Sequence, residues 1–198
     1  MALTRWSHDC AVASVCRPRP RACAAPSSAI SPKAPDPELD AVTAAFLGAG
    51  AKFVVIGGFA VIAHEYVRAT EDVDLLIPED PANDERCEGA LASLEAVWAP
   101  DGTPLSKRRV VGRDHSRLLT RCGLVDLLRE GSPPLDFATV AKGAERADLG
   151  SGEFLLAGLA SLVSFKRLAG RPRDRLDLEE LEVRHGELPI EELPGFDS

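Results

Sequence analysis

The chain has 198 residues, 45% of them hydrophobic, which is enough to bury the core of one domain of ordinary size. Its formal net charge of −8 at pH 7 argues against broad electrostatic adhesion to DNA or an anionic membrane, although it leaves room for a nucleotide or a tRNA end held in one local site. No apolar run approaches the roughly 20 residues that span a bilayer, and residues 1–30 lack the continuous apolar segment of a secretory signal, so we expect a cytoplasmic protein without a membrane partner.

Residues 1–36 differ in composition from the rest, and we predict a disordered tail there, followed by one folded domain at 37–198. The tail is rich in Pro, Ala, Ser and Arg without periodicity, and it holds five Lys and Arg against two Asp and Glu. An overextended gene start and a weak organelle-type leader stay open as alternatives. We interpret all five cysteines of the chain as reduced thiols, because a metal cluster on His8, Cys10, Cys16 and Cys23 would match no common zinc spacing.

From residue 37 onward, helical and strand-like segments alternate. In chain order we expect a helix at 37–50, a strand at 52–58, a helix at 59–67, a strand at 73–77, a helix at 82–98, one strand within 108–121 and another at 124–128. A short helix at 136–144, a strand at 152–157 and two helices at 159–170 and 173–185 follow, the last two separated by Gly170 and Pro172. This alternation predicts an α/β domain with a small mixed sheet, flanking helices and a C-terminal helical hairpin.

The strand at 52–58 ends in Gly57 and Gly58, immediately before a helix. Two glycines allow a tight turn and expose backbone N–H groups at a helix N-terminus, an arrangement that binds phosphate. For the glycine pair alone, a plain strand-to-helix turn is the commoner explanation.

The segment "EDVDLLI" places Asp72 and Asp74 at the mouth of an apolar strand. Residues i and i+2 of a strand face the same side, so the two carboxylates can point into one spot, where they repel each other. A divalent cation resolves that conflict, and Mg²⁺ commonly joins one or two carboxylates to substrate phosphates. A solvated strand edge is the alternative, and glycosyltransferases also use a DxD motif.

Asp126 stands in "GLVDLLRE", flanked on both sides by apolar strand residues, where an unpartnered carboxylate is costly. If this strand lies beside the strand at 73–77, three carboxylates converge. Such a cluster can hold two metal ions and support in-line displacement at phosphorus. An edge-strand Asp that faces water is the alternative.

In the last helix, Asp174 and Asp177 share a stripe with Leu178 and Leu181, which predicts that these carboxylates face the body of the protein. Lys166 on the preceding helix can reach a phosphate or pair with Asp174. A second apolar stripe opposite weakens this inference, so ordinary helix-surface charge stays open as an alternative.

These pieces follow one another in a specific order: strand, GG and helix, then RxTxDxD, then a strand Asp, then K-x4-RPRD-x2-D. The order resembles the minimal nucleotidyltransferases of the DNA polymerase β superfamily, and most of all the bacterial AbiEii-type and related stand-alone nucleotidyltransferases. The resemblance covers about residues 38–185 and rests on four separated motifs. It implies a polymerase-β-like nucleotidyltransferase fold for residues 37–198.

The resemblance also implies a role for each matching residue. It implies phosphate binding by Gly57 and Gly58, metal binding by Asp72, Asp74 and Asp126, nucleotide contact by Lys166, an acceptor-side role for Asp174, and strand orientation and phosphate contact by Arg68 and Thr70. Asp126 would also help to activate the acceptor hydroxyl. The chain departs from the pattern at Glu65, where many relatives have Gly.

The function that this resemblance implies is Mg²⁺-dependent transfer of a nucleoside monophosphate from an NTP to a hydroxyl, with two metal ions. The acceptor is an RNA, a protein or a small molecule, and a role in a toxin–antitoxin or phage-defence pair fits this group. The alternative is a non-catalytic binding or regulatory module that pairs with a cognate antitoxin. All three acidic positions are filled, which favours catalysis. A glycosyltransferase would need a larger nucleotide-sugar domain than this chain offers.

Overall fold

The computed structural model of the protein describes residues 34–129, 131 and 133–197. The predicted tail therefore lies outside the described residues except for 34–36, and the alternative cluster of His8, Cys10, Cys16 and Cys23 lies outside them entirely. The boundary between tail and domain stays a prediction. Among the described residues, Cys87 and Cys122 are buried free thiols, and no helix has both the length and the apolar character to cross a membrane.

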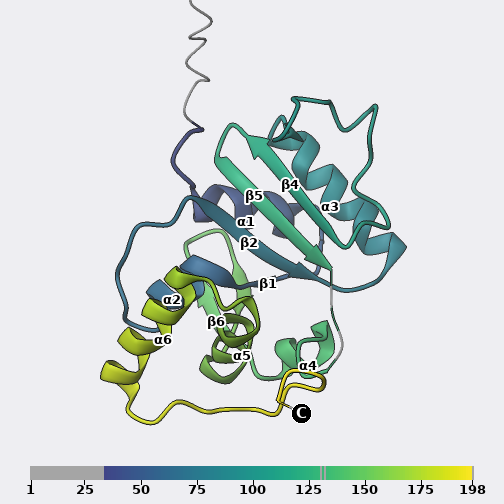
Figure 1. Ribbon diagram of the computed structural model, residues 1–198. Helices are drawn as coiled ribbons and strands as arrows, with labels where there is room; N and C mark the ends of the chain where they lie inside the picture. The colour runs from purple at the N-terminus through teal and green to yellow at the C-terminus, as the bar shows by residue number, and fades with distance from the viewer. Residues whose placement is uncertain (1–33, 130, 132, 198) are drawn as a thin grey trace, which may run out of the picture. The chain divides into compact units, whose positions relative to one another are not determined.

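The described residues build a seven-stranded mixed sheet with the order β3-β4-β5-β2-β1-β7-β6 (Figure 1). Strands β2 and β5 run parallel, as do β1 and β7, and the other neighbouring pairs are antiparallel. The strands are β1 (Val54–Val55), β2 (Asp72–Ile77), β3 (Val97–Trp98), β4 (His115–Thr120), β5 (Gly123–Arg129), β6 (Glu145–Asp148) and β7 (Glu153–Leu156).

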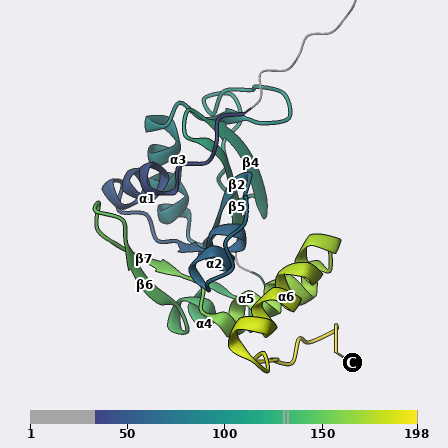
Figure 2. The ribbon, with the colours of Figure 1, turned by 90° about the vertical axis from the view of Figure 1, so that its left-hand side faces the viewer.

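Helices flank this sheet, and two of them form the C-terminal hairpin. Helices α1 and α3 pack together on one side of β2 and β5, whereas α5 and α6 lie on the other side (Figure 2). The helices are α1 (Leu39–Gly48), α2 (Gly57–Ala63), α3 (Pro81–Ser93), α4 (Phe137–Lys142), α5 (Leu159–Ala169) and α6 (Pro172–His185). The predicted fold class, a small mixed sheet with flanking helices and a C-terminal helical hairpin, is confirmed.

The prediction of one helix over 82–98 is wrong at its C-terminal end. Helix α3 ends at Ser93 because Glu95 adopts a left-handed backbone with φ 58°, and the N–H of Ala96 then closes onto the carbonyl of Leu91 at 3.0 Å. The next two residues, Val97 and Trp98, form strand β3 and pair with β4. Their β-branched and aromatic side chains suit a strand better than a helix end.

The predictions for the strands differ from the structure in two places: one predicted strand is too long, and one strand was missed. The segment "RRVVG" is not part of β4: the N–H of Val110 donates to Oε1 of Glu88 at 2.8 Å, so a side chain takes the place of a neighbouring strand. Strand β6, with the sequence "ERAD", was not predicted. It is an edge strand of mostly exposed polar residues, and its polarity hides any period of two.

The alternation of β2 decides which side of the sheet carries the site. Val73 and Leu75 are fully buried, whereas Asp72 and Asp74 line a cavity together with Phe165 and Lys166 of α5. Successive side chains of a strand point to opposite faces. Asp72 and Asp74 therefore point away from α1 and α3, toward the side where α5 lies.

Candidate active site

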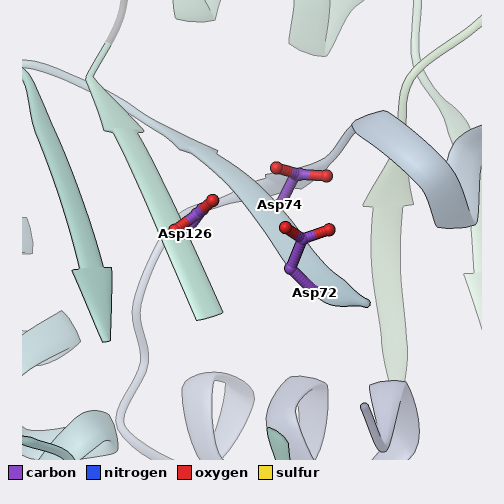
Figure 3. A group of neighbouring side chains, drawn as sticks. All are labelled: Asp72, Asp74 and Asp126. Carbon is purple, nitrogen blue, oxygen red and sulfur yellow. The ribbon is translucent and has the colours of Figure 1, made fainter. Parts of the chain in front are cut away.

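Three carboxylates meet on the face of the sheet opposite α1 and α3. Strand β5 lies directly beside β2, and the parallel register places Asp126 opposite Asp74. One oxygen from each of Asp72, Asp74 and Asp126 lies within 4.8 Å of the other two, and Figure 3 shows the three side chains projecting from the neighbouring strands. The sequence predicted that the three carboxylates converge if these two strands are neighbours, and the structure contains both the pairing and the convergence.

Burial and mutual repulsion disfavour the charged forms of two carboxylates in this cluster. The pKa of Asp74 is raised from 3.8 to about 6, chiefly by burial and further by the nearby charges of Asp72 and Asp126. A hydrogen bond from the backbone N–H of Gly58 and the charge of Lys166 act in the opposite direction. Burial also raises the pKa of Asp126, although Arg117 counteracts it. These shifts indicate a site that would gain from a bound cation.

Strand β4 supplies two basic side chains that the sequence analysis did not select. Arg117 places Nη1 at 2.6 Å from Oδ2 of Asp126 and Nη2 at 3.1 Å from Oδ2 of Asp72. His115 places Nε2 at 3.6 Å from Oδ1 of Asp126. Both face the carboxylates because Arg117 stands opposite Asp126 in the antiparallel ladder and His115 lies two residues away. The alternation of His115 and Arg117 with buried Ser116 and Leu118 is the signal that identifies this face.

The glycine pair lies against the carboxylates and their lead-in segment. Gly57 has φ +62°, and a Cβ atom on it would stand 1.9 Å from Oδ2 of Asp74. A Cβ atom on Gly58 would stand 2.3 Å from Oγ1 of Thr70. Thr70 in turn donates to the carbonyl of Asp72 at 3.3 Å. Both glycines are therefore needed for the close approach of this turn to β2.

A buried ion network joins the lead-in segment to the C-terminal hairpin. Nζ of Lys166 lies 2.9 Å from Oδ1 of Asp174 and 2.7 Å from Oδ2 of Asp177. Arg68 donates through Nη2 to Oδ2 of Asp177 at 2.9 Å, and its Nε lies 2.7 Å from Oδ1. Lys166, Asp174 and Asp177 are all buried. Of the two sequence expectations for Lys166, pairing with Asp174 is what this structure contains, and Asp177 is an added partner.

The N-terminus of α6 is fixed by the same network. Nε of Arg171 lies 2.7 Å from Oδ2 of Asp174, and the backbone N–H of Arg171 donates to the same oxygen at 3.2 Å. Burial alone would raise the pKa of Asp174, but hydrogen bonds from Arg171 and Lys166 bring that pKa below its ordinary value. Asp174 is therefore an ionised carboxylate that pairs with two cationic side chains of the protein, Lys166 and Arg171.

Apart from His115 and Asp177, the site residues described above line one cavity of about 380 Å³. The nine residues predicted from the sequence are all in its wall: Gly57, Gly58, Arg68, Thr70, Asp72, Asp74, Asp126, Lys166 and Asp174. Arg117, Arg171 and Arg173, which the sequence analysis did not select, line it too. Arg173 is held in place by a hydrogen bond from its guanidinium to the carbonyl of Ala69. The cavity thus combines an acidic cluster with several cationic groups, although the roles of the residues stay predictions.

No protein-family model matches this chain, and no curated protein sequence matches it. Among solved structures, one that is similar is the crystal structure of ANT(2'')-Ia in complex with adenylyl-2''-tobramycin. The two chains share 16% identity over 72% of this chain and 89% of that chain, with a TM-score of 0.45. A likeness at this level identifies neither a substrate nor an activity.

Proposed function

We propose that the protein is a nucleotidyltransferase of the polymerase β-like superfamily, of the AbiEii type or a related stand-alone group. The observation that carries this proposal is the triad of Asp72, Asp74 and Asp126, whose oxygens lie within 4.8 Å of one another in a cavity that also holds cationic side chains. The proposed reaction moves a nucleoside monophosphate from an NTP to the hydroxyl of an RNA, protein or small-molecule acceptor. We also propose a cytoplasmic location, which the free thiols of Cys87 and Cys122 support.

The donor set of the triad fits a divalent cation. All three ligands are carboxylate oxygens, which Mg²⁺ prefers. Burial and the neighbouring charges of Asp72 and Asp126 raise the pKa of Asp74, an effect that a bound cation would oppose. Oδ1 of Asp126 is buried, and Nε2 of His115 lies 3.6 Å from it, beyond hydrogen-bonding distance. We propose that Asp72, Asp74 and Asp126 hold one or two Mg²⁺ ions. When bound, Mg²⁺ would neutralise the triphosphate and lower the pKa of the attacking hydroxyl.

In the proposed reaction, the acceptor oxygen forms a bond to the α-phosphorus. The bond from that phosphorus to the oxygen that bridges to the β-phosphate breaks, and pyrophosphate leaves. In this proposal, Asp126 takes the hydroxyl proton and passes it to water. Arg171 and Arg173 line the cavity and are exposed, so they can neutralise the departing pyrophosphate. Arg117 is 39% exposed, so it can turn from the carboxylates to the phosphates when substrate enters.

Label transfer tests this function directly. The full chain is incubated with Mg²⁺ and each of the four α-labelled NTPs in a cell lysate, and labelled products are identified by mass spectrometry. We expect label on one class of acceptor with the wild type, and none with Asp72→Ala or Asp74→Ala. Equal labelling by the wild type and the double variant would contradict the enzyme proposal.

A second candidate is a non-catalytic binding module of a toxin–antitoxin pair. It is favoured by the fact that Lys166 already binds two carboxylates and that Arg117 bridges Asp72 and Asp126. In that case a cognate antitoxin should bind tightly and should still bind after both Asp72→Ala and Asp74→Ala. If these two substitutions abolish binding of the antitoxin, the result would count against this candidate and favour the catalytic function.

A further inference from the structure

A second cavity, also of about 380 Å³, adjoins the carboxylate site. Its floor is Leu76 of β2 and Leu128 of β5, its roof is formed by Phe165, Leu168 and Ala169 of α5, and Leu193 of the C-terminal segment closes one side. This volume is at the small end of the range for small-molecule sites, which is roughly 300 to 1,000 Å³.

The two cavities adjoin each other and share three wall residues. Leu128, Phe165 and Ala169 belong to the walls of both. Leu128 lies two residues after Asp126 on the same strand, so both side chains are on one face, roughly 7 Å apart along β5. A molecule bound in the second cavity beside Leu128 therefore has one end roughly 7 Å from Asp126 along β5.

The chemistry of the second cavity differs sharply from that of the first. Apart from Arg129, every described residue in its wall is apolar or glycine. The guanidinium of Arg129 lies 2.7 Å from Oδ2 of Asp84, and both side chains are buried, so its charge is already neutralised inside the protein. Leu168, by contrast, leaves 53% of its surface exposed at this cavity. The wall offers no free charge to a phosphate backbone or to a polycation.

We infer that the second cavity binds the acceptor of the proposed reaction, and that this acceptor is a small molecule with an uncharged apolar body and a hydroxyl on a short arm. The inference rests on the proposed function, and it selects the small molecule over the RNA and protein acceptors. The apolar body occupies the space between Leu128 and Leu168. Its hydroxyl extends toward Asp126, and the nucleotide lies in the first cavity.

Binding of a probe tests the pocket without any turnover. The probe is 2-naphthylmethanol, which has an apolar ring and a primary hydroxyl and can be followed by its fluorescence. Leu168→Glu adds a charge at the cavity, and Leu176→Glu is the matched control because Leu176 is 48% exposed on α6 and lines neither cavity. We expect Kd to rise at least tenfold in Leu168→Glu and to stay within twofold of the wild type in Leu176→Glu. Equal affinities of the two variants would overturn the inference.

Label transfer then separates failure of the pocket from failure of the function. α-Labelled NTP and Mg²⁺ are offered with uncharged lipophilic alcohols, including the probe, and in parallel with a short RNA and with a polycationic sugar. Label on the alcohols that is lost in Leu168→Glu supports the inference. Label on the RNA or the polycation alone overturns the inference but leaves the proposed function intact. Absence of label on every acceptor, with the probe still bound, contradicts the proposed function and the acceptor role with it.

Discussion

Gly57 lies directly against Asp74, so closely that a Cβ atom on Gly57 would stand 1.9 Å from a carboxylate oxygen. The backbone of Gly57 also has φ +62°, which L side chains rarely adopt. Conformation and space thus both exclude any other residue. The turn at the start of α2 and the acidic cluster of β2 are therefore one structural unit. A substitution in the turn should displace the carboxylates, and a substitution of a carboxylate should change the packing of the turn.

Gly57→Ala should consequently damage both stability and the site. We expect a loss of about 1–2 kcal/mol from the left-handed backbone, with a further loss from displacement of Asp74. Urea unfolding measures the free energy. Gly89→Ala is the matched control: Gly89 lies inside α3 with nothing within 4 Å of an added Cβ, so it should gain about 0.5–1 kcal/mol. A Gly57→Ala variant as stable as Gly89→Ala would contradict this geometry.

The pKa of Asp74 makes stability depend on pH. In the unfolded chain Asp74 loses its proton near pH 3.8, whereas in the folded chain it keeps the proton until about pH 6. Stability therefore falls as pH rises from about 4 to about 6, and the penalty is fully present above pH 6. A rise of about two pKa units corresponds to a penalty on the order of 3 kcal/mol.

Asp74→Asn removes this titrating group, so the free energy of unfolding should depend less on pH between about pH 4 and pH 6. The measurement is urea unfolding of both proteins at pH 4 to 7.5 with EDTA present. The wild type should lose stability relative to Asp74→Asn as pH rises, because only the wild type has the carboxyl group whose pKa is raised to about 6. A constant difference between the two proteins across the window would show that Asp74 does not titrate as described.

Divalent cations should stabilise the wild type, because an ion bound only by the folded state adds RT ln(1 + [L]/Kd) to its stability. At pH 7.5, about 100-fold more free Mg²⁺ or Mn²⁺ than the Kd corresponds to about 2.7 kcal/mol, which thermal unfolding detects easily. Asp72→Asn, Asp74→Asn and Asp126→Asn should each lose most of this shift. Asp40→Asn, which removes an exposed carboxylate of α1 far from the triad in sequence, should keep it. Equal shifts in all four variants would indicate binding elsewhere.

The shared face of Asp72 and Asp74 could be predicted because the two-residue period of a strand fixes which side chains point the same way. The approach of Asp126 was predicted only on the condition that its strand pairs with β2, as it does. The contribution of Arg117 could not be predicted, because it depends on the pairing of β4 with β5, and strand pairing is a tertiary choice. The partnership of Arg68 with Asp177 spans 109 positions and requires the hairpin of α5 and α6 to dock beside α2. Apolar spacing predicted the existence of these helices but not their docking.

Glu65, where the motif resemblance leads us to expect Gly, has a backbone conformation that is unfavourable for Glu. Its φ of 71° lies in the left-handed region, where glycine is favoured. Glu65→Gly should therefore stabilise the fold by about 1 kcal/mol, against the usual effect of added glycine. Glu182→Gly in the interior of α6 is the opposite control and should destabilise by about 1 kcal/mol. Equal losses in both variants would rule out relief of strain at Glu65.

Asp177 should be the costliest single carboxylate to remove. It is fully buried and binds both Arg68 and Lys166, so Asp177→Ala leaves two cations without their shared partner. Loss of one partner from a buried pair costs about 3–5 kcal/mol, whereas the exposed pair of Glu180 and Arg184 on the same helix is worth about 0–1 kcal/mol. Glu180→Ala is therefore the control. Arg68→Met in the Asp177→Ala background should recover part of the loss, because Asp177 is the carboxylate that Arg68 pairs with, whereas Lys166 keeps Asp174. Strict additivity of the two changes in urea unfolding would mean that Arg68 and Asp177 are not coupled.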